Sequence, residues 1–199
     1  MGPSGPSLFE DGVNMKKFSE LIIAAANLAD EEVDNAQWAI WFNDGLDDLA
    51  EVLFIPTKMT ITPSVSGGFA LPENLKTVLR VDGITTNLAV LKYGDDVSLG
   101  YKIFDNELFI QGEIPTEIIL QYDRYPAHVS ASATSANVDI SDHYTEALVL
   151  FACAKTMARE DETERYNIFM QEYMAAKVKI SKLVSRAKPG KSGIIEVFR

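Results

Sequence analysis

Residues 121–151 read QYDRYPAHVSASATSANVDISDHYTEALVLF, and the spacing of the apolar residues changes within this stretch. Before Pro126 apolar and polar residues alternate, which is typical of a strand, and from residue 142 apolar residues recur at helical spacing. Proline lacks a backbone N–H and biases its neighbour to extended geometry, so the strand is expected to end at Pro126. Residues 127–141 are predicted to be a slack Ala/Ser-rich spacer, and Ser141 or Asp142 is expected to cap the following helix. The stretch therefore predicts a joint between a strand region and a helical region.

The chain before this joint begins with helical patterns and continues with strand patterns. Residues 15–29 have apolar positions at helical spacing, and Asp30 or Asp34 is expected to cap a second helix that ends before Pro56. From residue 56 to residue 126 the period is 2, in short runs separated by Gly, Asp, Asn and Pro. Asp105-Asn106 is predicted to form a two-residue hairpin loop, because both residue types tolerate positive φ. Sequential short strands with tight turns indicate an antiparallel sheet or a small barrel. The apolar positions that define the second helix are Trp38, Trp41, Phe42, Leu46, Leu49, Val52 and Leu53.

Two further helices are predicted after the joint, the second beginning near Asp161, which with Glu164 resembles a capping box. The predicted fold class is α+β: an antiparallel helical bundle made of N- and C-terminal helix pairs, with an inserted β region. The predicted divisions are a flexible leader at 1–14, a discontinuous bundle at 15–55 and 142–186, a β region at 56–126, a spacer at 127–141 and a C-terminal tail at 187–199.

Composition limits the classes of function. The 199 residues carry a net charge of −11, which disfavours a nucleic acid as a bound partner, because DNA affinity comes mainly from Lys and Arg. The single cysteine, Cys153, excludes an intramolecular disulfide and a cysteine-based zinc site, and its apolar neighbours indicate a buried, inert thiol. No apolar run is long enough for a transmembrane helix, and the N-terminus lacks the features of a signal peptide. The chain is therefore expected to be made in a cytoplasm, with no membrane partner.

Both histidines, His128 and His143, lie in the opening stretch together with serines and aspartates, which raises the alternative of a small hydrolase. A catalytic triad would need a serine nucleophile, a histidine base and an orienting aspartate. No nucleophile-elbow or oxyanion-loop motif accompanies these residues, and a nucleophile must be held rigidly. We therefore expect no enzyme activity and no cofactor. The candidate serines are Ser130, Ser132, Ser135 and Ser141.

Acidic residues cluster on one face of the second predicted helix, at Asp44, Asp47, Asp48 and Glu51. No histidine accompanies them and no EF-hand loop is present, so a solvated acidic face is favoured over a metal site. No metal is expected.

The order of segments resembles the head–tail connector, or adaptor, proteins of tailed bacteriophages. The resembling patterns are WFNDGLDDLAEVL in the second helix, ITPSVSGGFALPENLKTVLRVDG in the β region, the strand end Tyr122-x-x-Tyr125-Pro126, and ISDHYTEALVLFACAKTMAREDETERYNIFMQEYMAAK at the closing helix pair. Of these, LPENLKTVLRV carries the resemblance furthest.

The resemblance implies a structural virion protein of the neck, assembled in the host cytoplasm. It implies a ring of copies of this chain, usually a dodecamer, that docks on the portal protein and presents a platform to tail or nozzle proteins. DNA would pass through the ring without specific binding, and Asp44, Asp47, Asp48 and Glu51 are candidate channel-facing residues. The extended end is the candidate partner-binding segment. Other neck or tail-completion proteins, a small hydrolase and a cellular α+β binding module remain alternatives. The candidate partner-binding residues are Ile194, Ile195, Val197, Phe198 and Arg199.

Overall fold

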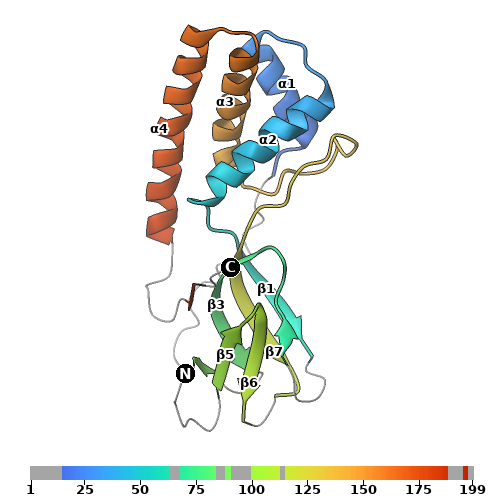
Figure 1. The fold of residues 1–199 in the computed structure, drawn as a ribbon, viewed down its shortest axis with the longest axis vertical. Coiled ribbons are helices and arrows are strands. Elements are labelled where there is room, and N and C mark those ends of the chain that lie inside the picture. Colours follow the sequence, from blue (N-terminus) through green and yellow to red (C-terminus); the bar gives the residue numbers. More distant parts are fainter. Residues whose placement is uncertain are drawn as a thin grey trace. The chain divides into compact units, whose positions relative to one another are not determined.

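The structure is a computed structural model, and it describes residues 15–62, 68–83, 88–90, 100–112, 115–187 and 195–196 (Figure 1). The chain forms two compact units. The first, called here the helical unit, comprises Met1–Phe54 and Pro126–Lys188, and the second, the β unit, comprises Ile55–Tyr125 and Pro189–Arg199. The fold class is α+β, as predicted.

The helical unit contains α1 (Phe18–Ala29), α2 (Asn35–Ala50), α3 (Asp142–Arg159) and α4 (Thr163–Ala187). Helix α3 is central, because α1, α2 and α4 all pack against it (Figure 1). Its sequence is accordingly apolar over most of its circumference, including Cys153 and the fully buried Leu148. Helix α4 is longer and more polar, and it buries only one stripe, which includes Tyr173 and Ile180. None of the helices among the described residues is both long and apolar enough to span a membrane.

Aromatic side chains of α1 and α2 form part of the hydrophobic core of the helical unit. Phe18, Trp38 and Phe42 are fully buried. The rings of Phe18 and Phe42 meet edge to face at 5.5 Å, and those of Trp38 and Trp41 at 5.4 Å. Such edge-to-face pairs add to the free energy gained from burying the rings.

Helix caps agree with the sequence only in part. Asp34 caps α2 as predicted, accepting a hydrogen bond from the backbone N–H of Gln37 at 2.8 Å. Ser141 occupies the cap position of α3, but its side chain makes no capping hydrogen bond, so that prediction is wrong in its chemistry. Asp161 is not a cap, because it lies in the turn before α4 with a left-handed φ of 59°.

The predicted spacer, residues 127–141, is not slack. Val138 and Ile140 are buried, and Val138 N–H donates to the carbonyl of Lys16 at 2.8 Å. Asn43 of α2 exchanges two hydrogen bonds with the backbone of Val129, at 2.8 and 3.1 Å. These hydrogen bonds to the start of α1 and to α2 are long-range contacts that local composition does not show.

The β unit contains two four-stranded sheets, ordered β1-β7-β3-β8 and β2-β6-β5-β4. Neighbouring strands are antiparallel except for the short β4–β5 pair, and within the described residues neither sheet closes into a barrel. The barrel alternative is therefore wrong. Residues of both sheets, among them Val78, Tyr101 and Leu120, share one hydrophobic core. The strands are β1 (Pro56–Ile61), β2 (Phe69–Ala70), β3 (Leu75–Gly83), β4 (Ala89–Val90), β5 (Gly100–Phe104), β6 (Glu107–Gln111), β7 (Ile118–Arg124) and β8 (Ile195–Glu196).

Two features predicted for the β region are present. Asp105 and Asn106 form the two-residue loop between β5 and β6, with φ values of 51° and 58°, and Phe104 pairs with Glu107 across it. Strand β7 ends at Arg124, just before Pro126. Asp123 of β7 is buried and accepts a hydrogen bond from the backbone N–H of Ile55 at 2.7 Å. The Asp123 carboxylate therefore has a structural partner.

Candidate functional site

The acidic residues of α2 form one stripe of the helix, because positions 44, 47, 48 and 51 are separated by three or four residues. The structure describes a basic partner for each of them within the helical unit. Asp44 lies 3.7 Å from Lys155, and Asp47 lies 2.8 Å from His128 Nε2. Lys177 Nζ bridges Asp48 at 2.7 Å and Glu51 at 3.3 Å. Sequence reasoning missed these partners, because they lie on α3, α4 and the segment before α3.

Asp48 is the centre of the network that joins α2 to α4. Its carboxylate accepts hydrogen bonds from the buried Tyr173 hydroxyl and from Lys177. Partial burial opposes ionisation of Asp48, but these two donors outweigh it, so its pKa lies below the ordinary value of 3.8. Burial also tends to lower the pKa of Lys177, but the hydrogen bond and charge of Asp48 raise it above 10.5. The network therefore favours the ionised pair.

Because the folded-state pKa of Asp48 is depressed, its contribution to stability is present above about pH 4, the pKa region of the unfolded carboxyl, and is lost as the pH falls through the lower folded value. Asp48→Asn is expected to reduce the free energy of unfolding by about 1 kcal/mol at pH 7, since the pair is partly exposed. The difference between the two proteins should shrink towards zero as the pH falls below 3.8. Urea titrations followed by tryptophan fluorescence measure this directly, because both tryptophans, Trp38 and Trp41, lie on α2. An unchanged difference at acidic pH would contradict the assigned network.

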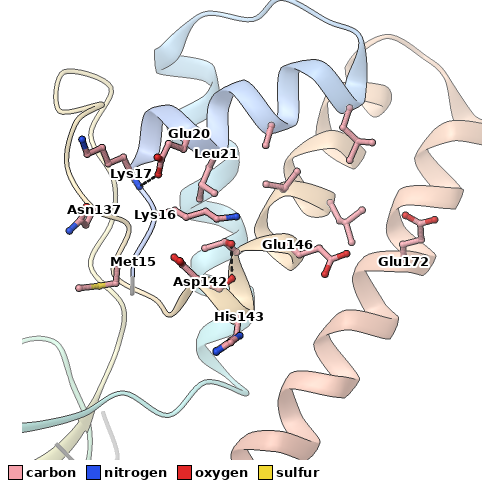
Figure 2. A pocket seen from close by; sticks show the side chains of 15 residues that line it. Met15, Lys16, Lys17, Glu20, Leu21, Asn137, Asp142, His143, Glu146 and Glu172 are labelled. Carbon is pink, nitrogen blue, oxygen red and sulfur yellow. Dashed lines mark hydrogen bonds between the residues drawn. The ribbon is translucent and has the colours of Figure 1, made fainter. Parts of the chain in front are cut away.

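A groove runs between α1, α3 and α4 (Figure 2). Its volume is about 1140 Å³, and a second hollow of about 410 Å³ continues it between α3 and α4. The two hollows share His143, Glu146, Leu150 and Glu172. Figure 2 shows Glu146 on α3 and Glu172 on α4, on either side of the groove. The sequence carries only a weak signal for this groove, because its lining mixes charged, small and aliphatic residues from three helices, which also occur on ordinary surfaces.

The groove has an apolar floor and a partly acidic lining. Apolar lining residues include Leu21 and Ala24 from α1, Leu150 from α3, and Ala175 from α4. Asp142 Oδ1 is buried and accepts no hydrogen bond. In the described part of the chain, neither Glu146 nor Glu172 forms an ion pair or side-chain hydrogen bond. A groove of this size and openness is better suited to a segment of a protein than to a small ligand.

The residues that raised the hydrolase alternative are brought to different places. His128 lies against Asp47 of α2, whereas His143 is exposed in the groove. Ser130 and Ser132 hydrogen-bond to each other at 2.9 Å. Within the residues that the structure describes, no serine hydroxyl is hydrogen-bonded to either histidine, and no cluster of metal-ligating side chains occurs. The arrangement thus offers no assembled nucleophile and base.

Cys153 is buried in α3, and its thiol lies 3.5 Å from the carbonyl of Ala25. Burial is the main reason that the pKa of this thiol is raised, to about 12. The thiolate fraction at neutral pH is therefore very small, and thiolates are the reactive form.

The predicted partner-binding segment is described only at two residues. Ile195 and Glu196 form β8, which pairs antiparallel with Val78 and Thr77 of β3 in the same chain. Ile194, Val197, Phe198 and Arg199 lie outside the described residues.

The structure thus combines a central helix packed against three others, a two-sheet unit and an open groove in the helical unit. The class is that of the head–tail adaptors of tailed phages. Residues 16–191 match the family model of the SU10 adaptor protein, and the chain belongs to that family. The comparison with curated proteins finds no match. Family membership supports the resemblance stated from the sequence, and it identifies the chain as a structural component of a phage particle.

Proposed function

We propose that this chain is the subunit of a ring that docks on the portal protein and links it to the tail around the DNA channel. The observation that carries the proposal is the adaptor-family match over residues 16–191, which covers most of both compact units. A head-to-tail contact repeated about an axis closes into a ring, and the helical unit offers different surfaces on different helices for such a contact. Imaging of the chain mixed with purified portal tests the proposal.

The charge of the chain is consistent with DNA passing through the ring. A net charge of −11 provides little of the Lys and Arg attraction that retains DNA. The sequence suggested the acidic stripe of α2 as the channel surface. The ion pairs with Lys155, Lys177 and His128 weaken this suggestion, because they partly neutralise the stripe. We retain Asp44, Asp47 and Glu51 as the candidate channel-facing residues, since their side chains are at least half exposed. Asp48 is held more closely by Tyr173 and Lys177.

The C-terminal tail is proposed to contact the portal or a neighbouring copy through Ile194, Ile195, Val197, Phe198 and Arg199. An apolar extended segment can add a strand to an exposed sheet edge. The pairing of Ile195 and Glu196 with β3 in the same chain supports strand addition as the mode of this contact.

Removal of residues 189–199 is expected to leave both units folded, because β8 adds only two residue pairs, worth about 2 kcal/mol in total at most, to the sheet. Binding to purified portal should weaken by about tenfold or more if the tail contributes several buried apolar side chains. Co-sedimentation with portal measures the binding, and removal of residues 1–14 provides the control truncation. Portal binding that survives the C-terminal truncation unchanged would remove the tail from the proposed interface.

A different neck or tail-completion station is the second candidate function. It predicts a ring that binds a tail protein but not the portal, so the same co-sedimentation with each partner separately distinguishes the two.

A further inference from the structure

The inference rests on the proposed ring and concerns the surfaces that build it. Helix α4 packs on α3 along one stripe, and its opposite stripe is uncovered in the helical unit. Met174, Val178 and Lys182 lie on that uncovered stripe at positions i, i+4 and i+8. Met174 is 51% exposed and Val178 is 50% exposed. Two large apolar side chains that are neighbours at i and i+4 on an exposed helix face can form part of a contact surface.

The second half of α4 is also basic in a chain that is otherwise acidic. Residues 173–187 contain Lys177, Lys179, Lys182 and Arg186 and no acidic residue, whereas the whole chain has a net charge of −11. Among the described residues Lys182 has no carboxylate partner, while Lys177 is occupied by Asp48 and Glu51. The uncovered stripe of α4 is therefore apolar with an available cation at its C-terminal end.

The groove between α1, α3 and α4 has the complementary character. The part that its two hollows share contains Leu150 at the floor, the carboxylates of Glu146 and Glu172, and the imidazole of His143. Near it, Asp142 presents a buried oxygen that accepts no hydrogen bond. Lys17 lies beside Glu20 at the start of α1, whereas the Lys16 side chain extends into the first hollow between α1 and α3 (Figure 2), and Lys179 lines the second hollow. The part that the two hollows share thus combines an apolar floor with two carboxylates that form no ion pair among the described residues.

We propose that the Met174–Val178–Lys182 stripe of one copy seats in the α1–α3–α4 groove of a second copy. The apolar side chains would cover the floor formed by Leu150 and its neighbours, and the Lys182 ammonium would approach the carboxylates of Glu146 and Glu172. A basic amphipathic helix in an apolar groove with acidic walls is a recurrent mode of recognition. The two surfaces belong to different parts of the same unit, so the contact is head to tail, as a ring requires.

A second copy is the occupant because one chain carries both complementary surfaces. The α2 stripe fits the groove less well, because its exposed carboxylates, although partly neutralised, would face those of Glu146 and Glu172, and like charges placed opposite each other disfavour binding.

Cysteine cross-linking of the full-length chain, assembled with purified portal, tests the contact. The native Cys153 is buried with a raised pKa, so an introduced surface thiol reacts selectively. Val178→Cys on one population and Ala24→Cys on the other should give a heterodimer on oxidation or with a short bismaleimide. Ile23→Cys is the matched control for Ala24→Cys. Ile23 lies on α1, as Ala24 does, and is 61% exposed, but it does not line the groove. A chain with both Val178→Cys and Ala24→Cys should give a ladder of higher oligomers.

Charge reversal adds an independent readout. Lys182→Glu on the Val178→Cys chain should lower the cross-linked yield about tenfold at low salt, and Glu172→Lys on the Ala24→Cys chain should restore it. Failure of the second change to restore the yield would contradict the charge pairing.

The outcomes separate this contact from the proposed function. Rings on the portal in which Val178→Cys links to Ile23→Cys, or to itself, overturn the groove contact and leave the ring intact. Linking of Ala24→Cys to the portal in place of a second copy overturns it in favour of a portal segment. The predicted cross-link without any ring on the portal supports the contact and contradicts the proposed function, whereas neither cross-link nor ring contradicts both.

Discussion

Trp38→Ala is expected to destabilise the helical unit by about 3–5 kcal/mol, the range for removing a large buried aromatic side chain. Trp38 is fully buried on α2, with its ring 5.4 Å from that of Trp41 and 6.1 Å from that of Phe42. The substitution removes apolar area, both ring contacts and the volume that separates α2 from the other helices. A loss of this size is a large fraction of the stability of an ordinary domain.

Urea denaturation followed through Trp41 fluorescence and far-ultraviolet circular dichroism measures the change. Ile40→Ala is the matched control, because Ile40 is on the same helix but 54% exposed, and its effect is expected to stay within about 0.5 kcal/mol. Equal effects of the two substitutions would contradict the placement of Trp38 in the core.

Gly45→Val is expected to destabilise the same unit by about 1–3 kcal/mol through overpacking. A Cβ at Gly45 would lie 3.0 Å from Phe151 Cδ1 and 3.1 Å from Leu148 Cδ2, so α2 approaches α3 closely at this point. Valine adds two γ carbons to that crowded space. Phe151 also packs edge to face on Tyr173 at 5.1 Å, so its displacement would disturb the Asp48 network.

The Gly45→Ala variant distinguishes destabilisation by steric crowding from the change in helix propensity. Alanine gains about 1 kcal/mol over glycine inside a helix, and this gain opposes the tight contact of a single Cβ. The alanine variant is therefore expected to lie near the wild type and the valine variant well below it in thermal denaturation. Ala36→Val, at an exposed position on α2, controls for the cost of β-branching. A Gly45→Val protein as stable as this control would show that α2 and α3 are not in close contact there.

Local signals predicted much of the fold. Helical spacing of apolar residues located the helices, Asp34 marked the start of α2, and Asp105-Asn106 marked the β5–β6 loop. Each of these features depends on residues within one turn or hairpin of each other, which a sequence displays directly.

Features that depend on distant residues were missed or predicted wrongly. Residues 127–141 were predicted to be slack because their composition is small and polar, yet Asn43, 86 residues earlier than Val129, fixes this segment. The α2 carboxylates were predicted to be simply solvated, but Lys177 reaches Asp48 from a helix 129 residues away in the chain. The groove is formed by three helices, and no single segment carries its pattern.

Imaging of the full-length chain mixed with purified portal decides whether the chain is the portal-docking adaptor. We expect a ring of density coaxial with the portal, present only in the mixture or enriched by it. A portal that remains bare at concentrations where the chain is folded and in excess would contradict the assignment of this chain as the portal-docking adaptor.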